Sequence, residues 1–129
     1  MSNIKSNEAH YRFKTVWGGK WKYGVGAGGD FRCSDSETPL IDLDTNTMNR
    51  FACIHDTDYT SVYECDIVRG RYNGEDIFGM VVILTDGPML QTEKEKYIPL
   101  NDLDAFFVVG NLVDDSDTYL DILVDLGIA

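Results

Sequence analysis

The residues best suited to chemistry are Cys53 and His55, which are two positions apart, with Cys65 further along the chain. A cysteine beside a histidine can form half of a zinc site, or a nucleophile with its base. Zinc needs four ligands that usually come as two close pairs, and Cys33 and His10 are both distant from this one pair. A nucleophile pair also needs a third group that orients the base. We therefore expect structural cysteines and a surface histidine, with no metal and no cofactor.

Two other motifs match reactive sites by letter but lack the necessary surroundings. Residues 24–29 read G-x-G-x-x-G, yet a dinucleotide site needs a helix directly after the glycines, and Pro39 follows within a polar stretch instead. Asp42 and Asp44 are spaced like the paired aspartates of haloacid-dehalogenase-type phosphatases. Asn46 stands where that family has Thr or Val, and the chain is too short for its fold. We expect that the protein is not an enzyme.

The balance of charge is the most unusual bulk property. The 129 residues include 22 acidic and 11 basic side chains, which gives a net charge of −11. Nucleic acid is bound mainly through basic contacts with its phosphates, so direct binding to nucleic acid is not expected. The surplus suits a basic protein as partner. The plainer alternative is an acidic surface that only keeps the protein in solution.

Acidic residues are concentrated near the C-terminus, in a segment that contains no Lys or Arg after Tyr97. The apolar residues of 118–126 recur at helical spacing and Gly127 follows as a C-cap, which predicts a short helix over 116–127. The acid run at its start lacks the Gly and the distal Glu of an EF-hand, so no calcium site is expected. The predicted partner-binding surface comprises Asp102, Asp104, Asp114, Asp115, Asp117, Asp121 and Asp125.

The predicted helix has two distinct sides. Residues four apart lie on the same side of a helix, so Asp117, Asp121 and Asp125 form an outward acidic row. The apolar side is expected to close one end of a β core, while docking on a partner or a second copy, giving a homodimer, is the alternative. This apolar stripe consists of Tyr119, Ile122, Leu123 and Leu126.

Runs of β-branched and aromatic residues predict the fold class. The runs 63–68, 77–84 and 106–113 are separated by turn-forming residues, of which Asn73-Gly74 is the clearest two-residue hairpin signal. The spacing predicts a mainly β fold, a small antiparallel barrel or meander of SH3-like type, with an N-terminal hairpin and a short C-terminal helix. Thr92–Lys96 is expected to be an exposed loop or edge.

The N-terminal hairpin has two plausible registers. We prefer a three-residue loop, Gly18-Gly19-Lys20, because it places Trp17 opposite Trp21 and separates the aromatic residues from the cations. The aromatic side is then a core face or, alternatively, a platform that stacks bases.

The whole chain is predicted to be one domain over 1–129. It would contain the hairpin and a glycine loop over 1–29, an irregular region over 30–61, the β core over 62–115 and the helix over 116–127. No apolar run reaches the roughly 18 residues of a membrane span, and the N-terminus lacks the pattern of a secretory signal. With 3 cysteines, an odd number, a reducing cytoplasm is the expected location.

The β core resembles a known family. Asp44-Thr45, then Asp56, then VYECDIV over 62–68, a strand around 78–82 and VVGNL over 108–112 are similar to the motifs of the YopX family of phage and prophage proteins. The resemblance implies a small, mainly β fold of viral origin and transfers no catalytic residue.

Several positions in these motifs are expected to be structural. Cys65 stands where the family usually has Gly, so an ordinary strand residue is expected in place of a sharp turn. The residues assigned structural roles are Asp66, Gly74, Gly110 and Asn111.

The expected function follows from the charge and from the resemblance. We predict a phage-encoded, non-enzymatic binding protein in the cytoplasm of a bacterial host. Its partner would be a basic host or phage protein, and it would inhibit or modulate a host protein. Mimicry of nucleic acid at a defence factor is its sharpest form. One alternative is a small-ligand or nucleotide-binding protein with a pocket lined by Trp17, Trp21, Cys53 and His55, and another is a virion or scaffold component.

Overall fold

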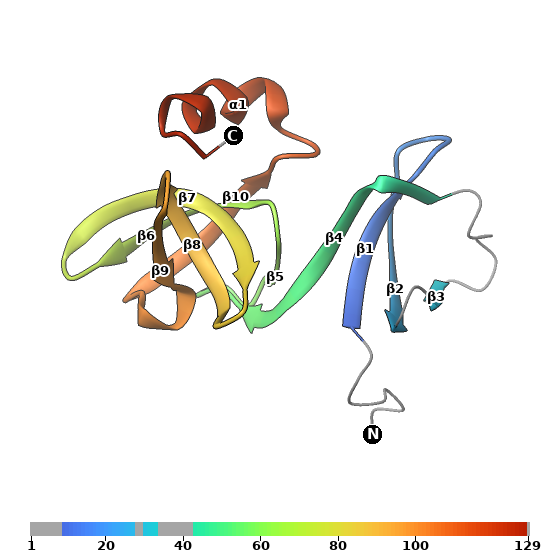
Figure 1. Cartoon of the computed structure of the whole chain (residues 1–129), viewed down its shortest axis with the longest axis horizontal. Coiled ribbons are helices and arrows are strands. Elements are labelled where there is room, and N and C mark those ends of the chain that lie inside the picture. Colours follow the sequence, from blue (N-terminus) through green and yellow to red (C-terminus); the bar gives the residue numbers. More distant parts are fainter. Residues whose placement is uncertain (1–8, 28–29, 34–42, 129) are drawn as a thin grey trace. The chain divides into compact units, whose positions relative to one another are not determined.

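A computed structural model of the chain describes residues 9–27, 30–33 and 43–128 (Figure 1). The fold is mainly β, as the sequence predicts, with antiparallel sheets and one α-helix in the described residues. Contacts gather in two compact units, Met1–Phe51 and Ala52–Ala129, where the sequence predicts one domain. Asp42, Gly28 and Gly29, which belong to the two motifs considered above, lie outside the described residues.

The first unit is an antiparallel sheet in the order β3-β2-β1-β4. The region 30–61, predicted to be irregular, instead holds two of these strands in its described part, β3 and β4, because its residues pair with β2 and β1. β4 is 13 residues long and continues into the second unit, where β5 (Ser61–Tyr63) lies beside it. The strands of the first unit are β1 (Ala9–Thr15), β2 (Trp21–Ala27), β3 (Asp30–Cys33) and β4 (Leu43–His55).

The predicted register of the N-terminal hairpin is wrong. Lys14 pairs with Trp21, and the N–H of Thr15 donates to the carbonyl of Lys20 over 2.8 Å, so the connection is longer than three residues. Paired residues point to the same side of a sheet, which places Trp21 among cations. The guanidinium of Arg12 lies 4.6 Å and the Nζ of Lys14 lies 5.2 Å from the centroid of the Trp21 ring. The preferred register separated the aromatic residues from the cations. In the structure Trp21 shares a face with Arg12 and Lys14, and cation–π attraction favours this arrangement.

A buried polar pair also stabilises the first unit. Arg12 and Asn49 are both buried, and the Nε of Arg12 donates to the Oδ1 of Asn49 over 3.0 Å. Burying a charged group is costly unless it is hydrogen-bonded, so this contact offsets part of that cost. Phe13 is the buried large apolar side chain of this unit in the described range.

The second unit contains an open five-stranded sheet in the order β10-β6-β7-β8-β9. Four consecutive strands form a meander, which was one of the two predicted forms. β10 and β9 are opposite edges, so the sheet does not close into a barrel, the other predicted form. β9 has only 4 residues and ends at Pro99, which cannot donate to a neighbouring strand, so it offers β10 little backbone to pair with. The strands are β6 (Asp66–Tyr72), β7 (Glu75–Leu84), β8 (Gly87–Glu93), β9 (Lys96–Pro99) and β10 (Ala105–Asn111).

The predicted hairpin at Asn73-Gly74 is confirmed. Tyr72 pairs with Glu75, and Asn73 and Gly74 have φ angles of 51° and 81°. Two successive positive φ angles define the turn type that matches the twist of a two-residue hairpin, and Asn-Gly favours it. The segment Thr92–Lys96, expected as a loop or edge, contains the turn between β8 and β9.

Both faces of the second sheet are buried. Side chains alternate along a strand, so Val68 and Val81 point to one cluster while Ile67 and Met80 point to the other. The first cluster is covered by the end of β4, by β5 and by the short 3-10 helix η2 (Leu100–Asp102), and the second by α1 (Ser116–Asp125). The first cluster comprises Ala52, Val62, Val68, Val81, Leu90, Leu100 and Phe106.

The helix α1 is confirmed within two residues of its predicted end, but its predicted stripe is partly wrong. Leu123 is fully buried and Tyr119 packs against the same cluster, whereas Ile122 is exposed. Tyr119 and Leu123 are four residues apart and therefore lie on the same side of α1, which faces the sheet. Ile122 lies between them in sequence and points away from that side. No helix in the described range is long and apolar enough to cross a membrane.

Candidate functional site

A compact junction joins β10 to α1. The Oδ1 of Asn111 accepts the N–H of Asp114 over 2.8 Å, and its Nδ2 donates to the Oδ2 of Asp114 over 3.0 Å. The carboxylate of Asp115 accepts the N–H of Asn111 over 3.0 Å. A Cβ at Gly110 would lie 2.7 Å from the Oδ2 of Asp115 and 2.9 Å from the Tyr119 ring, so this close approach requires glycine. Asp114 and Asp115, predicted to bind a partner, thus orient the helix.

A second turn contains Cys65 and Asp66. Cys65 has a φ of 67°, so the expectation of an ordinary strand residue is wrong, and cysteine adopts the left-handed conformation that glycine would favour. The Cys65 N–H donates to the carbonyl of Val81 and its own carbonyl accepts the N–H of Leu112, each over 2.9 Å. Asp66 is 1% exposed and its Oδ2 accepts the N–H of Tyr63 over 2.8 Å. These contacts tie the turn to β7 and to the end of β10.

Asp56 covers the outer edge of β10, a role that the sequence did not indicate. Its buried carboxylate accepts three backbone N–H groups, those of Asp58 and Thr60 over 2.8 Å and that of Val108 over 3.0 Å. Thr57 adds two bonds to Phe106, one through its own N–H and one through its hydroxyl. Val108 is 52 positions from Asp56 along the chain, so no local sequence pattern could have indicated this bond.

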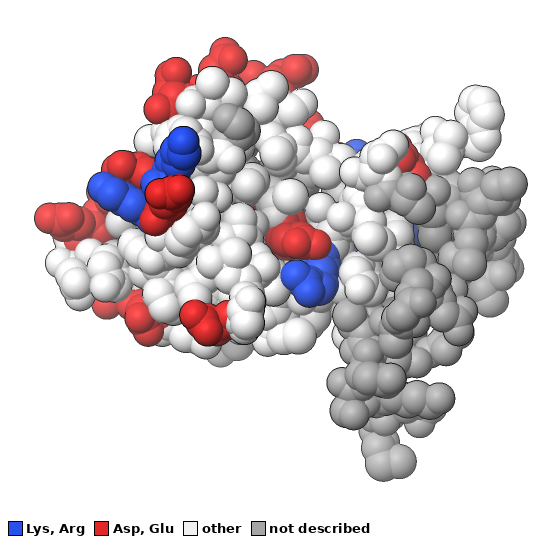
Figure 2. Space-filling view, viewed as in Figure 1, with Lys and Arg blue, Asp and Glu red and all other residues white. Residues whose placement is uncertain are grey.

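The outer side of α1 carries the acidic row that the sequence predicts. Asp117, Asp121 and Asp125 are all exposed, and Figure 2 shows acidic side chains gathered over α1, along the top of the view. Leu120 and Val124 are 44% and 53% exposed, and each lies three residues after an aspartate of the row. We call these five residues the acidic face of α1.

The remaining predicted aspartates lie elsewhere. Asp102 is part of η2 and Asp104 directly precedes β10, whereas α1 follows the other end of that strand. A strand of 7 residues spans roughly 20 Å, so Asp102 and Asp104 are at the opposite end of the sheet from α1 (Figure 1). Asp104 instead lies near the Asn73-Gly74 turn, where its Oδ2 is 3.4 Å from the Gly74 nitrogen.

The residues considered for metal binding and for a pocket are distributed over both units. Trp17 and Trp21 belong to the first unit, and Cys53 and His55 are exposed on the part of β4 that belongs to the second. Among the described residues, no three His, Cys, Asp or Glu side chains converge as a metal site would require. The side chain of Cys33 lies outside the described part of the chain.

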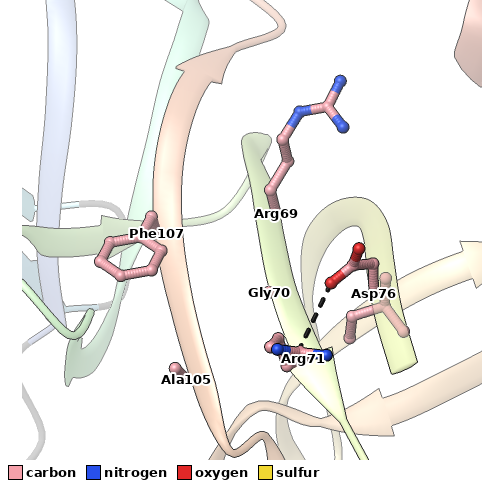
Figure 3. Close-up of a pocket in the computed structure, with 7 residues that line it drawn as sticks. Arg69, Gly70, Arg71, Asp76, Ala105 and Phe107 are labelled. Atoms are coloured by element: carbon pink, nitrogen blue, oxygen red, sulfur yellow. Dashed lines mark ion pairs between the residues drawn. The ribbon is translucent and has the colours of Figure 1, made fainter. Parts of the chain in front are cut away.

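A hollow of about 330 Å³ opens instead on β6, β7 and β10, and its residues were not singled out from the sequence. Arg69 and Arg71 alternate with Gly70 along β6, so both arginines point to the face on which Ile67 packs against α1. In Figure 3 the backbone of Gly70 lies between the other labelled residues, with Phe107 and Ala105 on the β10 side and Asp76 on the β7 side. We call this feature the arginine hollow.

No family model, curated protein or solved structure matches this chain. The resemblance to the YopX family therefore stays a prediction, and function must be inferred from the two surfaces just described. The acidic face of α1 can attract a cationic protein, while the arginine hollow can donate hydrogen bonds to a small anion.

Proposed function

We propose that the protein is a non-enzymatic binding protein that docks a cationic protein through the acidic face of α1. The observation that carries the proposal is the exposed row Asp117, Asp121 and Asp125 beside the exposed apolar pair Leu120 and Val124. Apolar side chains supply the desolvated centre of an interface, and charges around them give orientation and a fast encounter. The net charge of −11 strengthens the steering of a basic partner.

The spacing of the row favours a partner that normally binds nucleic acid. With a rise of about 1.5 Å per residue, carboxylates four residues apart are separated by about 6 Å along the helix. One strand of B-DNA presents a phosphate about every 3.4 Å of its axis, so the row offers roughly half that charge density over about 12 Å. Such a row can occupy part of a basic groove. We infer an inhibitor or modulator of a host nucleic-acid-binding protein. The most specific version of this proposal has a defence factor as the target.

The same row argues against a homodimer through α1. A two-fold interface places the same patch on both subunits, so Asp117, Asp121 and Asp125 would face their own copies. Like charges across an interface are unfavourable. A different, cationic protein is therefore the better partner, and the phage origin that the YopX resemblance implies fits a bacterial host protein. The scaffold alternative would require self-association that this repulsion opposes.

Charge removal on α1 is expected to abolish most of the binding. The wild-type protein and a D117N/D121N/D125N variant would be used as baits in a bacterial lysate, and proteins that high salt elutes would be identified and purified. We expect the variant to bind the purified partner at least about tenfold more weakly at 0.1 M salt, because three interfacial charges are lost. Wild-type affinity should fall as salt rises.

A second variant tests whether binding depends on the location of the charges or only on their number. D58N/D86N/D102N removes three exposed aspartates outside α1 and has the same net charge as the α1 variant. We expect its affinity to stay within about threefold of wild type, since charges more than a Debye length from the interface are screened. Equal losses in the two variants, or a lysate without any salt-eluted partner, would overturn the proposal.

A further inference from the structure

The arginine hollow contains a cationic group whose hydrogen-bond donors are unused. The guanidinium of Arg69 lies over the ring of Phe78, 5.1 Å from its centroid, and within the described part of the chain it makes no hydrogen bond or ion pair. Stacking on an aromatic ring fixes the plane of a guanidinium and leaves its N–H groups pointing outward. Arg69 is therefore oriented in advance to receive a planar or tetrahedral anion.

A second cation is held loosely at the other side of the hollow. The Nε of Arg71 lies 3.5 Å from the Oδ1 of Asp76, and its Nη2 donates to the carbonyl of Gly74 over 2.9 Å. The side chains of Arg71 and Asp76 are 61% and 90% exposed. An exposed pair of this kind contributes little stability, so an incoming anion can displace Asp76 at small cost. Figure 3 shows this pair beside Gly70.

The wall opposite the ion pair is apolar. Phe107 is 39% exposed although it is a large hydrophobic residue, and Ala105 lies two positions before it on the same strand. Phe107 pairs with Arg69 and Ala105 with Arg71, so an aromatic ring and a small side chain line the hollow beside the two cations. The volume of about 330 Å³ falls in the range of small-molecule sites.

We propose that the arginine hollow binds a small anion carried on a flat ring, of the class of nucleoside monophosphates. Arg69 and Arg71 receive the phosphate, because guanidinium groups donate paired hydrogen bonds to phosphate oxygens. Phe107 provides an exposed face for the base. This site lies outside the acidic face of α1 and is independent of the function proposed above. It also differs from the tryptophan-lined pocket that the sequence suggested.

The test is a titration of the full-length, ¹⁵N-labelled chain, observed through its backbone amide signals. The probes are adenosine 5′-monophosphate, adenosine and inorganic phosphate. We expect the monophosphate to shift the amides of 69–71, 76–77 and 105–107 with a Kd below about 1 mM. Each fragment alone should bind at least about tenfold more weakly, because it lacks either the charge or the ring. Phosphate that binds as well as the nucleotide would overturn the role of the ring, and no shift at these amides would overturn the site.

Two substitutions with opposite expected signs sharpen the test. Arg69→Gln should weaken binding at least about tenfold, since it removes the unused donors, while Asp76→Asn should strengthen it by about threefold, since it removes the competing carboxylate. Lys96→Gln removes an equal charge from an exposed pair with Glu93 outside the hollow and should leave binding within about twofold. A gain of affinity in Asp76→Asn cannot arise from misfolding. Unchanged binding in Arg69→Gln, no gain in Asp76→Asn, or an equal loss in Lys96→Gln would overturn the proposal.

Discussion

Replacement of Asp56 by Ala is expected to lower the free energy of unfolding of the second unit by about 3 kcal/mol. The substitution leaves the N–H groups of Asp58, Thr60 and Val108 without their carboxylate acceptor. Water can replace the acceptor at Asp58 and Thr60, which are exposed, but less readily at Val108, which is a half-buried residue of β10. Urea unfolding followed by the amide signals of β6 and β7 measures the change.

Two further substitutions in the same turn test whether the lost acceptor or the lost charge causes the destabilisation. Asp56→Asn keeps the shape and one acceptor oxygen, so it should cost roughly half as much as Asp56→Ala. Asp58→Ala removes an exposed neighbouring carboxylate that makes none of these bonds and should stay within about 0.5 kcal/mol of wild type. If Asp58→Ala were as destabilising as Asp56→Ala, loss of local charge would explain the effect and the acceptor role would be wrong.

Truncation of Leu123 to Ala is expected to cost about 3 kcal/mol and to release α1 from the sheet. Leu123 is 0% exposed and is the fully buried residue of α1, where it packs in one cluster with Ile67 and Met80. Its loss leaves a cavity that the sheet cannot fill by collapsing. Hydrogen exchange of the α1 amides, compared with the amides of β6 and β7, distinguishes local release of the helix from unfolding of the unit.

Val124→Ala is the matched control, because it also truncates an aliphatic side chain of α1. Val124 is exposed, so little apolar area is lost, and alanine is the better helix former. We expect its stability to stay within about 0.5 kcal/mol of wild type. Because Val124 belongs to the acidic face, the same variant should nevertheless weaken partner binding. Comparable destabilisation by the two substitutions would show that α1 is not anchored through Leu123.

Local signals in the sequence predicted the local structure of the second unit. Asn73-Gly74 favours one turn geometry, and the apolar spacing of 118–126 favours a helix. Both structures could therefore be recognised without knowledge of their surroundings. The exposed row at Asp117, Asp121 and Asp125 follows from helical spacing in the same way. These features depend only on residues a few positions apart.

Features that depend on distant partners could not be predicted. The bond that the Val108 N–H donates to Asp56, and the approach of Asp115 to Gly110, exist only once β10 is placed. The arginine hollow requires the register that sets Phe107 opposite Arg69, although the alternation of Arg69 and Arg71 before a hairpin turn was a readable sign of two cations on one face. The hairpin register failed because hydrophobic patterning ignored the attraction between Trp21 and its neighbouring cations.

The covered edge of β10 limits how copies of this protein can associate. The backbone N–H and carbonyl of Phe106 and the N–H of Val108 are already bonded to the Asp56–Thr57 turn, so β10 offers no row of open groups there. A fibril grows only when every sheet presents two usable edges. In the open sheet of the second unit β9 is the remaining edge, and pairing two copies through it would consume both edges. Strand addition to this sheet therefore ends at two molecules and cannot propagate into a filament.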